Sequence, residues 1–80
     1  MESMFGQIQL FAFNIEMRGW MVCDGRMLQI MSNQALFSLL GTRYGGDGHT
    51  TFAIPNLKGL APHPELHYYI AIEGSYPERL

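Results

Sequence analysis

Three histidines and one cysteine are the side chains of this sequence best suited to hold a metal or to act as a nucleophile. His49, His63 and His67 could ligate a metal if a three-fold axis brought three copies of one histidine together. No acidic or thiol partner sits at ligand spacing, which favours ordinary positions in loops or on strand surfaces. Cys23 lies in an apolar run with only Arg26 as a nearby base, which is typical of a packed small hydrophobic side chain. We therefore expect no metal site and no catalytic thiol.

Asp24 and a glycine-rich stretch at 41–51 could suggest a catalytic carboxylate and a phosphate cradle. A phosphate loop, however, opens a helix after a strand, whereas this stretch follows a helical pattern and leads into Phe52. An Asp-Gly pair already has a structural task in a tight turn. We also find no paired acid and base, so the sequence predicts neither an enzyme nor a bound cofactor. We assign structural turn roles to Asp24, Gly25, Gly45, Gly46, Asp47 and Gly48.

Two apolar runs flank this Asp-Gly pair within residues 20–30, which predicts a β-hairpin with a two-residue type I′ turn. The register would pair Val22 with Met27 and Met21 with Leu28. Both faces of such a hairpin are apolar. We therefore expect one face to meet the core and the other to meet a neighbouring chain.

The remaining elements have conventional signals. Alternating residues at 7–13 predict a strand, and residues 52–54 predict a short strand that ends at Pro55. Apolar residues at helical spacing predict a helix over 34–40, with Ser32 or Asn33 as the N-cap and Gly41 as the stop. Aromatic and β-branched residues at 66–73 predict a C-terminal strand.

The sequence thus predicts one α+β domain over residues 1–80, a small mixed domain with a central β-hairpin, one short helix and a C-terminal strand. A chain this short buries only ~60% of its unfolded surface, so its stability needs a supplement. A single cysteine forms no intrachain disulfide. Only 15% of residues are charged against 48% hydrophobic, so the supplement we expect is oligomerisation, with part of the outer surface buried.

Charge and hydropathy narrow the classes of partner. The net charge is −2, with basic residues spread singly, so we expect no nucleic-acid partner. No apolar run approaches the ~20 residues of a membrane span, and the first residues lack the basic region of a secretory signal. We therefore expect cytoplasmic synthesis without a signal peptide.

Aromatic and methionine side chains are the candidate contact residues. The tyrosines could stack on sugars or pack at a subunit interface, and the sequence leaves both uses open. Clustered methionines favour core or subunit contacts over a ligand groove. Subunit or ligand contacts are accordingly assigned to Phe11, Phe13, Met21, Met27, Tyr44, Tyr68, Tyr69 and Tyr76.

Five ordered motifs resemble the phage tail collar domain family, which includes bacterial proteins labelled microcystin-dependent. They are GQIQLF at 6–11, GWMVCDG at 19–25, NQALFSLLG at 33–41, YGGDG at 44–48 and FAIPNLKG at 52–59. The resemblance implies a small mixed α/β unit in a trimeric tail fibre or related particle, near a receptor-binding tip. Family members usually carry a long polar insertion before the last strand, where this chain has only residues 60–65.

These features lead to one functional hypothesis and one alternative. The hypothesis is a structural assembly module of a phage tail fibre or phage-derived particle, a homotrimeric collar or tip component that ends in a virion tail or extracellular particle with other tail or fibre proteins. The alternative is a small carbohydrate- or receptor-binding module that uses Tyr44, the loop 45–48 and the terminal tyrosines, with a surface glycan as partner in host attachment.

Overall fold

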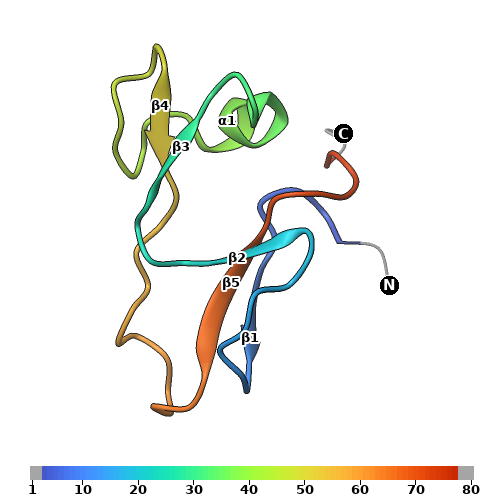
Figure 1. Ribbon diagram of the computed structural model, residues 1–80, viewed down its shortest axis with the longest axis vertical. Coiled ribbons are helices and arrows are strands. Elements are labelled where there is room, and N and C mark those ends of the chain that lie inside the picture. Colours follow the sequence, from blue (N-terminus) through green and yellow to red (C-terminus); the bar gives the residue numbers. More distant parts are fainter. Residues whose placement is uncertain (1–2, 78–80) are drawn as a thin grey trace.

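The computed structural model describes residues 3–77, which form five short strands and one helix (Figure 1). The strands form two antiparallel sheets, so the predicted α+β class is confirmed. No helix within 3–77 has the length and apolar character needed to cross a membrane. In chain order the elements are β1 (Ile8–Phe11), β2 (Trp20–Val22), β3 (Met27–Gln29), α1 (Gln34–Leu40), β4 (Thr51–Ala53) and β5 (His67–Ala71).

The C-terminal strand β5 is the centre of the larger sheet, whose order is β1-β5-β2. Its aromatic and β-branched residues suit a strand with neighbours on both sides. β1 pairs along one edge, with Ile8 opposite Ile70, and β2 pairs along the other, with Met21 also opposite Ile70. The predicted C-terminal strand is therefore present and organises this sheet.

The predicted hairpin at 20–30 is wrong. Val22 lies opposite Tyr69 of β5, whereas Met27 lies opposite Ala53 of β4, so β2 and β3 belong to different sheets (Figure 1). A type I′ turn needs positive φ at both central residues. Gly25 has a φ of 79°, but no described non-glycine residue has a positive φ, so the turn cannot form at Asp24.

The helix α1 has the predicted bounds, with Asn33 at the N-cap position and Gly41 at the C-cap. The Asn33 side chain donates to the Gln29 carbonyl (2.9 Å) rather than capping the helix. The Gly41 N–H donates to the Phe37 carbonyl (2.7 Å), and its φ of 58° lets the chain leave the helix. The helix is too short to persist alone and is stabilised by packing, with Leu36 fully buried.

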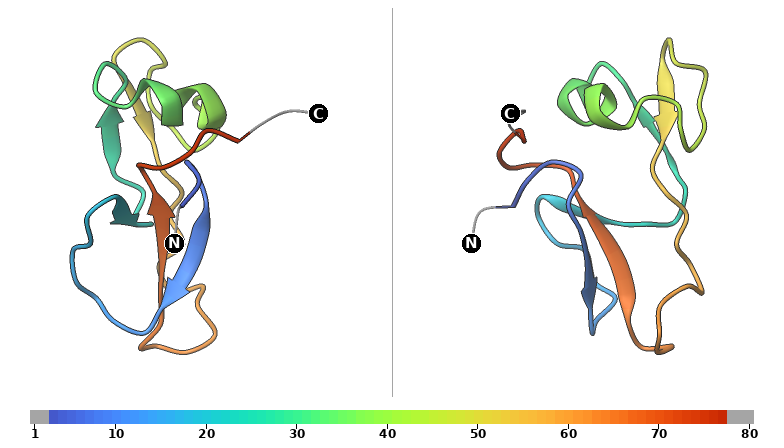
Figure 2. Two further views of the ribbon diagram at one scale, coloured as in Figure 1. Left: turned by 90° about the vertical axis from the view of Figure 1, so that its right-hand side faces the viewer. Right: turned by 180° about the vertical axis from the view of Figure 1, so that it is seen from behind.

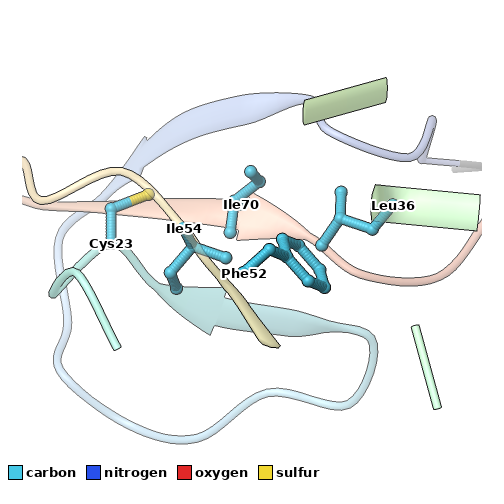
Figure 3. Packing of buried hydrophobic residues seen from close by; sticks show 5 residues of the cluster. All are labelled: Cys23, Leu36, Phe52, Ile54 and Ile70. Atoms are coloured by element: carbon cyan, nitrogen blue, oxygen red, sulfur yellow. The ribbon is translucent and has the colours of Figure 1, made fainter. Parts of the chain in front are cut away.

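The hydrophobic core lies between the two sheets and the helix (Figure 3). Ile70 reaches it from the larger sheet, Phe52 comes from β4 with Ile54 just beyond it, and Leu36 comes from α1. Cys23 closes one end of this cluster (Figure 3). The core therefore joins elements that no local turn connects.

The opposite face of the larger sheet carries an aromatic cluster. Phe11 lies between Trp20 and Tyr69, with ring centroids 5.4 and 5.3 Å away in edge-on geometry, and Phe13 lies 5.3 Å from Phe11. The Tyr69 hydroxyl accepts the Ile15 N–H (3.1 Å) and lies 2.9 Å from the Ile15 carbonyl. The segment 12–19 thus covers this face, where we had expected a neighbouring chain (Figure 2).

Candidate functional site

The glycine-rich loop 41–51 is held by one carboxylate. Asp47 accepts the backbone N–H groups of His49 and Thr50 (both 2.8 Å) and of Thr51 (3.0 Å), and also the Thr50 hydroxyl. These hydrogen bonds favour the ionised form and hold the pKa of Asp47 well below its usual range. All four of these hydrogen bonds come from groups inside the loop, so Asp47 serves the turn.

Close packing explains one glycine of this loop. Gly46 has a φ of +98°, and a Cβ at this position would lie 2.4 Å from the Cα of Phe52. The Ala53 N–H donates to the Gly45 carbonyl (3.0 Å), so the loop lies directly on β4. The loop therefore lies along the edge of β4 that faces away from β3.

The turn between the two sheets is held by an ion pair. Arg26 binds Asp24 through its guanidinium, with Nη2 2.7 Å from Oδ2 and Nε 3.0 Å from Oδ1. The Arg26 side-chain hydrogen bonds lower the pKa of Asp24 despite an opposing contribution from burial. In return, the Asp24 side chain raises the pKa of Arg26. This carboxylate is engaged as a turn residue.

The thiol and the histidines are not gathered into a site. Burial, and secondarily the Asp24 charge, raises the pKa of the Cys23 thiol to about 11, so the thiol stays protonated near neutral pH. Within residues 3–77, no three His, Cys, Asp or Glu side chains are grouped so that they could hold a metal ion. His63 Nδ1 accepts the Glu65 N–H (3.1 Å) in a local turn.

The eight predicted contact residues divide by exposure. Tyr69 is 2% exposed, so its ring and hydroxyl are used within the chain, and Phe11, Met21 and Tyr68 are half-buried. Phe11, Phe13 and Tyr69 come together in the aromatic cluster, and Met21 and Tyr68 both pack against the core. Large exposed areas remain on Phe13, Met27, Tyr44 and Tyr76.

Sequence reasoning missed two exposed apolar residues on the edge strand β1. Ile8 and Leu10 are 39% and 38% exposed on one face of β1. Their alternation with glutamines was visible in the sequence. This pattern predicted the strand but not the exposure of that face: the core covers Ile70 of the central strand and leaves the edge strand open.

A groove beside β5 was also missed. It has a volume of about 580 Å³ and lies between the β2 and β5 ends and the linker that leads into β5. Apolar side chains, two histidines, a lysine and a carboxylate line it. Only the proximity of Pro62, His63 and Pro64 in an irregular connector hinted at such a feature in the sequence. Its lining includes Val22, Asp24, Lys58, His63, His67 and Tyr68.

Comparison with known proteins identifies the class of protein to which this fold belongs. The family model of the Phage Tail Collar Domain matches residues 6–62, more than half of the chain. The chain therefore belongs to the phage tail collar domain family, as the five motifs predicted.

One similar protein shares part of this region. Protein RhiB of Rhizobium leguminosarum bv. viciae is 41% identical over 49 residues, which cover 58% of this chain and 22% of that protein. The chain thus spans about a fifth of the length of the curated relative it matches.

Proposed function

We propose that this chain is a non-enzymatic assembly module that forms a homotrimer, acting as a collar or tip component of a phage tail fibre or phage-derived particle. Membership of the collar family supports the tail-fibre role. The trimeric state is carried over to this chain from its resemblance to the collar family. The functional site is then a contact surface between subunits. The assembled module is located in a virion tail or an extracellular particle.

The observation that carries the proposal is the exposed apolar edge strand β1. Edge strands of stable monomers are usually protected by charge, bulges or covering segments. β1 instead presents Ile8 and Leu10 to solvent, on the strand that ends the β1-β5-β2 sheet. Burial of this edge by a second subunit would remove apolar surface from water and supply the stability that so small a core lacks.

Charge substitution on this edge tests the proposal. We expect the unmodified chain to elute as a trimer in size-exclusion chromatography with light scattering, and Leu10→Glu to elute as a folded monomer. Gln29→Glu is the matched control, because Gln29 is also an exposed strand residue but lies on β3 of the other sheet. A monomeric unmodified chain, or a Leu10→Glu variant that remains trimeric, would contradict the proposal.

A second candidate function is a carbohydrate- or receptor-binding module for host attachment. Its support is the exposure of Tyr44 in the glycine-rich loop and of Tyr76 after β5, since aromatic rings with free faces can stack on sugars. The Tyr76 hydroxyl lies 2.7 Å from the Ser38 hydroxyl, which leaves its ring at the surface. Selective glycan binding on an array, lost in Tyr44→Ala, would favour this function over a purely structural one.

A further inference from the structure

Each of the two sheets has two outer strand edges, and the chain covers one edge of each sheet with its own backbone. On the outer edge of β2, the Trp20 N–H donates to the Met17 carbonyl (3.1 Å). The Val22 carbonyl on the same edge accepts the Asp24 N–H (2.9 Å). On the outer edge of β4, the loop 41–51 supplies the hydrogen-bond partners. The remaining edges are those of β1 and β3.

The outer edge of β1 has no such cover. The Gln7 carbonyl accepts the Ala71 N–H (2.8 Å), so the backbone groups of every second residue from Gln7 onward face β5. The N–H and C=O groups of Ile8 and Leu10 therefore face away from the sheet. They have no hydrogen-bond partner within residues 3–77, and they lie beside the exposed side chains of the same two residues.

The outer edge of β3 is uncovered in a similar way. The Arg26 carbonyl accepts the Ile54 N–H (3.2 Å), so the N–H of the next residue, Met27, faces away from β4. Gln29 also faces away, and its carbonyl accepts the side-chain amide of Asn33 (2.9 Å). In the described part of the chain, the Met27 N–H and C=O and the Gln29 N–H have no partner. The Met27 side chain is 58% exposed.

The two uncovered edges are complementary. Each presents backbone donors and acceptors at two alternate residues, and each carries exposed apolar side chains, Ile8 and Leu10 on β1 and Met27 on β3. Neither strand contains a charged residue, so two copies can meet without the repulsion by which many edge strands avoid pairing. In the left view of Figure 2, β1 borders the larger sheet on the right and β3 borders the smaller sheet on the left. One chain can therefore offer both edges at once.

We propose that β1 of one chain pairs along β3 of the next copy of the same chain, so that a sheet continues across the subunit contact. A ring of three identical chains needs such a head-to-tail contact, which joins two different surfaces of the chain. Backbone hydrogen bonds between the two edges give affinity, and packing of Leu10 and Ile8 against Met27 removes apolar surface from water. The inference rests on the proposed trimer, for which it names the second half of each contact.

Charge substitution on β3 gives the first test. We expect Met27→Glu to elute as a folded monomer in size-exclusion chromatography with light scattering, because it places a charge against the apolar side chains of β1. Met31→Glu is the matched control, since Met31 is 85% exposed but lies outside the strands. Gln29→Glu should also remain trimeric, because Gln29 already brings a polar side chain to this edge. A trimeric Met27→Glu, or equal dissociation by Met31→Glu, would overturn the inference.

A mixture of two variants tests the pairing itself. Leu10→Glu removes the β1 half of the contact and Met27→Glu removes the β3 half. A mixture keeps one intact contact, between β1 of the Met27→Glu chain and β3 of the Leu10→Glu chain. We expect each variant alone to have the 9.1 kDa mass of one chain, and the equimolar mixture to form a one-to-one dimer. Absence of this dimer at ~1 mM of each chain would overturn the inference.

Amide hydrogen exchange on the unmodified protein gives a readout that needs no substitution. We expect the outward-facing amides of Leu10 and Met27 to exchange slowly in the assembled protein, and to become fast together on dilution to the monomer. Slow exchange at Leu10 with fast exchange at Met27 would overturn the inference and leave the trimer intact.

The trimer and the edge pairing fail separately. A trimer that Met27→Glu leaves intact would overturn only the edge pairing. Head-to-tail contacts that do not close give open filaments, so filaments that Met27→Glu abolishes would overturn only the trimer.

Discussion

Two segments pack against the two sheets, 12–19 on a face of the larger sheet and 41–51 along the edge of β4, and each is held by a different kind of anchor. The segment 12–19 is bound by the hydroxyl of Tyr69, a buried neutral group that contacts Ile15. The loop 41–51 is bound by Asp47, an exposed charged group that accepts three backbone N–H groups. The same task is therefore done once by burial and once by charge. The two segments should respond differently to substitution and to pH.

The shared core should produce the largest effect, because it supports both segments. Phe52 is fully buried and contacts Phe37 with ring centroids 5.3 Å apart. We expect Phe52→Ala to lower the free energy of unfolding by about 3 to 5 kcal/mol, measured by denaturant unfolding. Faster amide exchange should appear in both segments together. Phe52→Leu is the milder control. Faster amide exchange confined to one of the two segments would contradict a common core.

Substitution of Gly46 should affect only the loop 41–51. The added Cβ of Gly46→Ala would meet the Phe52 backbone at 2.4 Å, at a φ of +98°. We expect the backbone strain alone to cost about 1 to 3 kcal/mol, with the rest of the effect coming from the close contact. Gly41→Ala is the control, since it also has a positive φ but meets nothing within 4 Å. An equal decrease in unfolding temperature for Gly46→Ala and Gly41→Ala would show that the contact between the added Cβ and Phe52 is unimportant.

Removal of the buried anchor should loosen only the segment 12–19. We expect Tyr69→Phe to destabilise the protein by about 1 to 2 kcal/mol, because the Ile15 backbone groups lose their partner. Tyr68→Phe, at a half-buried tyrosine, serves as the control. An unchanged amide exchange rate at Ile15 in Tyr69→Phe would contradict this assignment.

Removal of the charged anchor should have the smallest effect and depend on pH. The pKa of Asp47 is lowered by its hydrogen bonds, so its stabilisation is fully present above pH ~4 and is lost as the pH falls through the lowered pKa. We expect Asp47→Asn to unfold more easily than the unmodified chain at neutral pH, with the difference shrinking in strong acid. Unfolding measured across this range checks the sign, and a difference that grows in acid would refute it.

Local signals were enough to predict the helix and the strand β5. Asn33 and Gly41 flank an apolar helical pattern and mark the bounds of α1, although the Asn33 side chain does not cap the helix. The hairpin prediction failed because Asp24 and Gly25 were assumed to join adjacent strands. Their strands instead pair with β5 and β4, which lie far along the chain. The buried cluster that contains Phe52 and Ile70 joins residues far apart in the chain, and no short pattern encodes such a distant relation.

The candidate site was less accessible to sequence reasoning for the same reason. We predicted Tyr69 to be a subunit or ligand contact. Its hydroxyl instead binds backbone groups of Ile15, 54 positions earlier in the chain. The groove beside β5 forms because β2 stops at Val22 while β5 begins at His67. These relations depend on strand register and length, which emerge only when the sheets assemble.

Sedimentation equilibrium of the unmodified chain, over a range of micromolar concentrations, tests the central claim of assembly most directly. The exposed edge strand β1 and the collar family together predict the mass of a trimer that holds across this range. A mass that stays at the 9.1 kDa of a single chain would contradict the proposed role as an oligomeric assembly module.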